Sequence, residues 1–196
     1  PPRSADPLAL PPEVRGKEHP WVSRGGMKLD HALTRFDIDV TNAVGLDVGA
    51  STGGFTDVLL TRGAARVYAV DVGYGQLNWK LRRDDRGVVL ARQHALQLTA
   101  EHIPEPVNII VCDASFIGLE KVLATPLTFA APGAHLAALI KPQFEVGKGE
   151  VGKGGIVRDP EQHREVCARI EAWVAGLDGW RVIGIDESPI TGAEGN

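Results

Sequence analysis

A glycine-rich turn, Gly49-Ala50-Ser51-Thr52-Gly53-Gly54, follows an apolar stretch that ends at Val48 and precedes a segment with helical periodicity. Glycine lets the backbone turn sharply, so a ligand can approach the first turn of the helix closely. Asp71 follows the next apolar stretch, where an acidic residue can bind both hydroxyls of an adenosine ribose. These features predict a binding site for a nucleoside-containing ligand. The alternative is a plain strand–turn–helix unit without a ligand.

The glycine spacing departs from the G-x-G-x-x-G pattern of dinucleotide-binding proteins. Ser51 stands where the second glycine of that pattern admits a pyrophosphate. Asp47 would repel a pyrophosphate, but it could hold a cationic amino group. The departures favour S-adenosylmethionine, which carries an ammonium, a sulfonium and a ribose diol but no phosphate, over a nicotinamide cofactor.

Apolar segments with strand character alternate with segments of helical periodicity along the chain. Strands are expected over residues 44–48, 66–71, 88–91, 107–112, 134–140 and 180–185. Helices are expected over residues 26–36, 54–62, 78–84 and 119–127, and a long helix is expected to begin at Asp159-Pro160. The alternation predicts an α/β, Rossmann-like fold with a mostly parallel sheet and helices on both faces.

Composition limits the classes of protein that this chain can belong to. Its 196 residues are 43% hydrophobic, which suits one domain with a sizeable core. No segment approaches the ~20 apolar residues of a membrane span, and residues 1–20 do not look like a signal peptide. The cysteines and histidines lack metal-ligand spacing, so we expect no metal. Cys112 lies in an apolar run, where we expect a buried, reduced thiol, and this fits a cytoplasmic location. The net charge of -4 by itself argues against a nucleic-acid partner.

Four charged residues fall at the ends of expected strands, namely Asp47, Asp71, Asp113 and Lys141. Ligands of parallel sheets bind beyond the carboxyl ends of the strands, so these residues are expected to converge on one site. Lys141 also opens a glycine-rich, basic segment that ends at Arg158. We interpret this segment as a mobile flap that contacts phosphates, with an ordinary solvated loop as the alternative.

Five sequence blocks, in order, resemble the TlyA family, which is often labelled hemolysin A. The blocks are SRGGMKL at 23–29, DVGASTGGFT at 47–56, VCDASFI at 111–117, LIKPQFE at 139–145 and SPITGAEGN at 188–196. That family belongs to the FtsJ-like group of ribose 2'-O-methyltransferases. The resemblance implies a class I methyltransferase fold and S-adenosylmethionine-dependent methylation of cytidine 2'-hydroxyls in ribosomal RNA.

The resemblance also implies roles for individual residues. It gives a catalytic tetrad of Lys28, Asp113, Lys141 and Glu194. Within this tetrad we assign Lys141 as the base that orients the hydroxyl and Asp113 as the residue that orients Lys141, with Lys28 and Glu194 as a supporting pair. The cofactor-binding residues would be Asp47, Gly49, Ser51, Gly53, Gly54, Phe55, Asp71, His94 and Asp113. Residues expected to contact RNA are Arg24, Lys148, Lys153 and Arg158. His94 departs from the family, which usually has asparagine near this position.

The same resemblance predicts the domain organisation. Residues 23–196 would form the methyltransferase domain without its last strand, which should lie beside strand five. Residues 1–22 would be the linker that follows a basic S4-like RNA-binding domain, whose absence would account for the negative net charge. The sequence leaves two further functions open, a membrane-active cytolysin and a non-catalytic RNA-binding module. It gives no indication of the oligomeric state.

Overall fold

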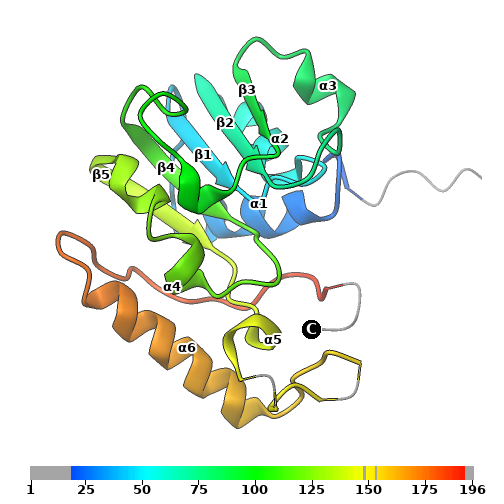
Figure 1. Cartoon of the computed structure of the whole chain (residues 1–196), viewed down its shortest axis with the longest axis vertical. Coiled ribbons are helices and arrows are strands. Elements are labelled where there is room, and N and C mark those ends of the chain that lie inside the picture. The colour runs from blue at the N-terminus through cyan, green and yellow to red at the C-terminus, as the bar shows by residue number, and fades with distance from the viewer. Residues whose placement is uncertain (1–18, 148, 153, 193–196) are drawn as a thin grey trace, which may run out of the picture.

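The computed structural model describes residues 19–147, 149–152 and 154–192. Five parallel strands form one sheet in the order β3-β2-β1-β4-β5 (Figure 1). They are β1 (Val44–Val48), β2 (Arg66–Asp71), β3 (Gly87–Ala91), β4 (Val107–Cys112) and β5 (Ala130–Ala138). The helices are α1 (Gly25–Arg35), α2 (Gly54–Thr61), α3 (Trp79–Arg82), α4 (Leu119–Val122), α5 (Pro142–Glu145) and α6 (Pro160–Ala175), with 3₁₀ turns η1 (Ala95–Gln97) and η2 (Pro126–Phe129). The predicted α/β fold with a parallel sheet is confirmed.

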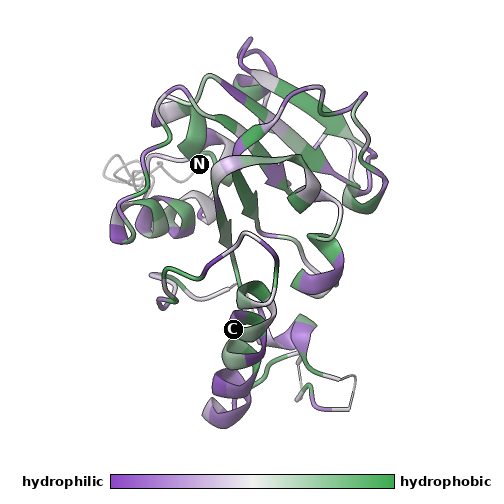
Figure 2. Ribbon diagram, turned by 90° about the vertical axis from the view of Figure 1, so that its left-hand side faces the viewer, coloured by the Kyte–Doolittle hydropathy of each residue, from purple (hydrophilic) through white to green (hydrophobic). Residues whose placement is uncertain are grey.

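Side chains alternate between the two faces of each strand, and a separate hydrophobic cluster covers each face. Figure 2 shows hydrophobic residues concentrated along the strands. One cluster joins the sheet to α1 and α2 through Leu29, Leu33, Phe55, Val58, Leu59, Val67, Ala69, Ile109 and Val111. The other joins the sheet to α4 and α6 through Leu46, Val48, Val70, Ile110, Cys112, Leu119, Val122, Val166 and Ile170. Both faces are therefore covered, as a parallel sheet requires.

The strand order places a ligand crevice between β1 and β4. The chain proceeds outward from β1 to β2 and β3 on one side, and through β4 to β5 on the other. Val48 is in register with both Val70 and Cys112, so these three strands end at one level. Gly49, Asp71 and Asp113 therefore share one edge of the sheet, at the point where such folds bind ligands.

The predicted sixth strand at residues 180–185 is wrong. This segment pairs with no strand among the described residues, and Ile183 and Ile185 remain about half exposed. An apolar pattern alone does not make a strand, because a strand also needs a neighbour for its backbone hydrogen bonds. The C-terminal segment instead runs as irregular chain past α1, where Gly184 contacts the ring of Phe36.

Several boundaries also differ from the prediction. The helix expected over 119–127 ends at Val122 and is followed by η2, because Pro126 cannot continue an α-helix. The basic segment that begins at Lys141 contains the short helix α5, which was expected to be loop. In the long helix α6, Val166 and Ile170 are buried, while Trp173, Val174 and, just beyond the helix, Leu177 are partly exposed.

The described end of the predicted linker, residues 19–22, packs against the domain. Trp21 is buried in the α1–α2 cluster, and the backbone N–H of Val22 donates to Asp57 at 2.9 Å. A Cβ on Gly26 would lie 2.5 Å from the Trp21 ring, so α1 approaches this indole closely. These residues are therefore part of the fold, and the remainder of the predicted linker lies outside the described residues.

Gly49 offers a test of how closely the loops after β1 and β4 approach. Its φ is +81°, and a Cβ there would lie 2.9 Å from the Cα of Ala114, which follows Asp113. Gly49→Ala should lower the free energy of unfolding by about 1–2 kcal/mol, because alanine is strained in the left-handed backbone conformation. The collision of its Cβ with Ala114 should lower it by a further ~1–3 kcal/mol. Urea unfolding measures the loss.

The matched control is Gly75→Ala, because Gly75 also has a positive φ, +70°, but no atom lies within 4 Å of its added Cβ. This variant should show the backbone cost alone. Equal destabilisation of the two variants would contradict the proposed close contact between the loops.

Candidate active site

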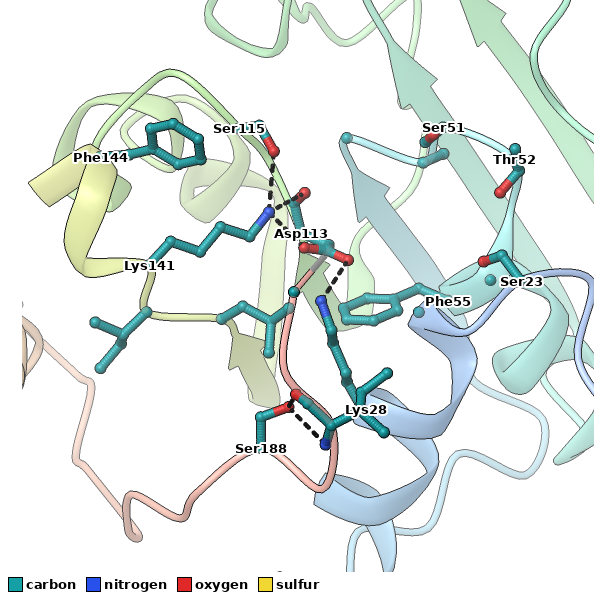
Figure 3. Close-up of a pocket in the computed structure, with 18 of the residues that line it drawn as sticks. Ser23, Lys28, Ser51, Thr52, Phe55, Asp113, Ser115, Lys141, Phe144 and Ser188 are labelled. Atoms are coloured by element: carbon teal, nitrogen blue, oxygen red, sulfur yellow. Dashed lines mark hydrogen bonds and ion pairs between the residues drawn. The ribbon is translucent and has the colours of Figure 1, made fainter. Parts of the chain in front are cut away.

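A pocket of about 450 Å³ opens at the carboxyl ends of β1 and β4 (Figure 3). Four segments line it: the start of α1, the glycine-rich turn, the residues after β4, and the residues from β5 into α5. Ser188, Ile190 and Gly192 of the C-terminal segment close a further side. A pocket of this size can hold a nucleoside-sized ligand.

Two lysines converge on one carboxylate inside the pocket. Lys141 Nζ lies 2.6 Å from Asp113 Oδ1, and it also donates to the Asp113 carbonyl and to Ser115 Oγ, each at 3.0 Å. Lys28 Nζ lies 3.8 Å from the other carboxylate oxygen of Asp113. Figure 3 shows the two lysine side chains reaching Asp113 from opposite sides. All three side chains are about four-fifths buried, which strengthens their mutual attraction.

The surroundings of Lys28 shift the pKa of its ammonium group. Burial lowers the pKa of Lys28 from its ordinary value, and the positive charges of Lys141 and Arg24 act in the same direction. Asp113 opposes this shift through its negative charge and hydrogen bond. Lys28 therefore releases its proton more readily than an exposed lysine does.

The glycine-rich turn forms the wall of the pocket opposite Lys141. Gly49, Ser51 and Gly53 all have positive φ values, and Phe55 and Gly54 begin α2 behind them. A Cβ on Gly53 would lie 2.3 Å from Leu81 Cδ1, so packing as well as conformation requires glycine there. The turn thus presents backbone and small side chains to the pocket, as a ligand cradle does.

Four of the predicted cofactor residues do not line the pocket. Gly53 is buried beneath it, and Asp71 accepts hydrogen bonds from Ser51 N and Gly73 N at 2.8 and 2.7 Å. His94 Nδ1 accepts from Leu96 N and so caps η1. Asp71 is the last residue of β2 and His94 lies three residues beyond β3, both at the pocket's edge of the sheet. Their contacts with a ligand stay predictions.

Asp47 is the fourth of these residues, and its side chain is completely buried between β1 and α2. Thr56 Oγ1 donates to Asp47 Oδ2 at 2.7 Å, whereas Oδ1 has no hydrogen-bond partner among the described residues. Burial raises the pKa of Asp47 to about 7, aided by the negative charge of Asp113 and opposed by the Thr56 hydrogen bond. The sequence predicted a carboxylate that faces the ligand, but the structure places it one layer behind the pocket.

The raised pKa of Asp47 makes stability depend on pH. An unfolded aspartate titrates near 3.8, so the folded protein holds an extra proton between that pH and about 7. The stabilisation from the neutral carboxyl is complete below about pH 4 and is lost as pH rises towards 7. Asp47→Asn cannot ionise, so its stability relative to wild type should increase from pH 4.5 to 7 and then level off. Urea unfolding across this range measures the difference, and a difference independent of pH would contradict the assignment.

The C-terminal segment is anchored to α1 beside the pocket. Asp186 Oδ2 lies 3.0 Å from His31 Nε2 and 3.2 Å from Arg35 Nε, and these contacts lower the pKa of Asp186. Ser188 and Ile190 follow and reach the pocket. Glu194, the fourth residue of the predicted tetrad, lies outside the described residues, as do Lys148 and Lys153.

Three residues of the site escaped the sequence analysis as individual candidates. Ser115 binds Lys141, while Phe116 and Phe144 form a tilted aromatic pair with ring centroids 5.0 Å apart. Phe116 is 90% exposed and has a φ of +66°, which is unusual for a large side chain. All three lie in blocks that carry the family resemblance, which was the available signal for them.

The described residues show two absences. Their His, Cys, Asp and Glu side chains form no group of three or more that could hold a metal ion. None of the helices in this part of the chain is sufficiently long and apolar to cross a membrane.

Comparison with known proteins identifies the class. The model of the FtsJ-like methyltransferase family matches residues 21–196. A Mycobacterium tuberculosis protein named 16S/23S rRNA (cytidine-2'-O)-methyltransferase TlyA is 50% identical over 183 residues, which cover 93% of this chain and 68% of that protein. The fold and the sequence together show that the chain belongs to the FtsJ-like methyltransferase family.

Solved structures agree with this assignment. A protein named as a hemolysin from Streptococcus thermophilus is 41% identical, with a TM-score of 0.86, over 93% of this chain and 66% of that one. Another from Lactococcus lactis is 42% identical, with a TM-score of 0.84, over 90% and 84%. The chain thus spans about two thirds of the length of some relatives. The resemblance to the TlyA family is confirmed, and proteins named hemolysin share its fold.

Proposed function

We propose that this protein transfers a methyl group from S-adenosylmethionine to a ribose 2'-hydroxyl of cytidine in ribosomal RNA. The observation that carries the proposal is the cluster of Lys28, Asp113 and Lys141 in a pocket beside the glycine-rich turn. The name of the M. tuberculosis relative supplies the RNA and the nucleotide. Ribosomal RNA as the substrate would also fit the cytoplasmic location expected from the sequence.

The pocket suits the proposed cofactor in shape and charge. Gly49, Ser51 and Gly54 line the pocket with backbone and small side chains, and Phe55 adds an apolar surface. Asp71 lies at the end of β2 next to the turn, where a carboxylate can bind a ribose diol. Asp71 brings a negative charge to this edge of the sheet, which favours a cationic ligand. When bound, S-adenosylmethionine supplies an electrophilic methyl group on a sulfonium centre.

The lysines are placed to orient and deprotonate a hydroxyl. Lys141, held by Asp113 and Ser115, would hydrogen-bond the ribose 2'-oxygen and, when neutral, would accept its proton. Asp113 fixes the direction of the Lys141 side chain. Lys28 completes the support with its own contact to Asp113, and Glu194 is proposed as its partner. Correct alignment of the oxygen accounts for much of the acceleration in such displacements.

The mouth of the pocket fits an RNA substrate. Phe116, which is exposed, and the half-buried Phe144 lie beside Lys141, whose Nζ is 5.9 Å from the Phe144 ring centroid. Aromatic side chains beside an active site stack on a base that has left its own stack. Arg24 and Arg158 are exposed, and we propose that they contact RNA phosphates together with Lys148 and Lys153.

Titration calorimetry tests the cofactor directly. The protein should bind S-adenosylmethionine and should not bind NAD, because Ser51 occupies the position that a pyrophosphate needs to approach the turn. Gly49→Ala should weaken the binding, since its Cβ would displace Ala114 beside the pocket. Binding of NAD without S-adenosylmethionine would overturn the cofactor assignment.

Transfer of labelled methyl from S-adenosylmethionine to ribosomal RNA tests the reaction. Lys141→Ala and Lys141→Arg should each lower turnover at least ~100-fold, because arginine keeps the charge but cannot act as a base near neutral pH. Lys121→Ala is the control, since Lys121 is exposed on α4 away from the pocket lining. Near-normal turnover of Lys141→Arg would refute the base assignment. RNA binding by wild type without any methyl transfer would instead indicate a non-catalytic binding module.

A further inference from the structure

Glu145, the last residue of α5, has a buried carboxylate whose role the proposed reaction does not explain. Its side chain is only 4% exposed, although it sits on a four-residue helix at the edge of the fold. Burial of a carboxyl group is costly unless hydrogen bonds and a counter-charge compensate for the lost water. Its partners therefore indicate what the burial achieves.

The first partner belongs to the segment that carries Asp113. Glu145 Oε1 accepts a hydrogen bond of 2.8 Å from the backbone N–H of Leu119, the first residue of α4. Gly118, at the N-cap of α4, has no side chain that could accept this bond. Glu145 thus replaces the missing cap and holds the end of the loop that contains Asp113, Ser115 and Phe116.

The second partner is a cation on α6. Arg169 Nη2 donates to Glu145 Oε2 at 2.9 Å and to the Glu145 carbonyl at 3.1 Å. Its Nη1 lies 2.5 Å from Glu120 Oε1, and these contacts raise the pKa of Arg169. Arg169 therefore compensates the buried charge and holds the end of α5 to α6. Figure 1 shows α5 next to α6.

The two loops that form the catalytic cluster are consequently tied at two points. At one end, Lys141 of the β5–α5 connection binds Asp113 and Ser115. At the other end, Glu145 binds Leu119. The N-cap residue of α5 is Lys141 itself, which makes no side-chain cap hydrogen bond, so this short helix depends on external contacts for its position.

We propose that Glu145 is a positioning residue that sets the orientation of Lys141 relative to Asp113 by tying α5 to the N-terminus of α4. It touches no reacting atom. The inference rests on the proposed function and deepens it, since it assigns the alignment of the catalytic lysine to a carboxylate outside the pocket. A displacement of about 1 Å in such a group can cost ~100-fold in rate.

The test compares three variants of the whole protein in the methyl-transfer assay. Glu145→Ala removes both contacts and should lower kcat at least ~10-fold. Its dissociation constant for S-adenosylmethionine should stay within about threefold, because the glycine-rich turn lies on the other wall of the pocket. Glu145→Gln keeps an oxygen acceptor for Leu119 N and should recover most of kcat. Glu120→Gln, the control, removes the other carboxylate of Arg169 and should behave like wild type.

Hydrogen exchange gives a readout that does not need turnover. Glu145→Ala should increase amide exchange in residues 114–119, whereas Glu120→Gln should not. Normal kcat in Glu145→Ala, equal losses in the Ala and Gln variants, or parallel losses of cofactor affinity and kcat would each overturn the inference. An inactive wild type would refute the proposed function, while the exchange result would still decide whether Glu145 ties the two loops.

Discussion

The site depends on Asp113, whose carboxylate binds two lysines that are far apart in the sequence. Lys28 comes from α1 and Lys141 follows β5, and both reach Asp113 at the end of β4. Without this carboxylate the two cations would repel each other. The repulsion would be strong because all three groups are largely shielded from water. One negative charge thus holds together three elements that are distant in sequence.

The remainder of the fold keeps Asp113 in place. Asp113 follows β4, an inner strand between β1 and β5, and both faces of the sheet are covered by helices. Gly49 lets the turn after β1 pass within contact distance of Ala114, and Glu145 holds the far end of the following loop. The pocket is therefore supported by the parallel sheet, a glycine contact and a buried carboxylate.

Burial gives the acidic residues of this edge different tasks. Asp113 faces the pocket and balances two cations, whereas Asp47 is wholly buried behind it with a pKa raised to about 7. Asp71 binds the backbone of the glycine-rich turn. Three aspartates that look alike at strand ends thus differ in charge and access.

The sequence by itself determined the parallel α/β fold, the glycine-rich turn and the convergence of Asp113 and Lys141, because apolar periodicity and strand ends follow from local residue order. It also carried the family resemblance in its ordered blocks. Only the tertiary structure showed that residues 180–185 have no strand partner, that Asp47 lies behind the pocket and that Glu145 caps α4. Those properties depend on which segments meet in space, and contacts between distant residues leave no periodic signal in a single sequence.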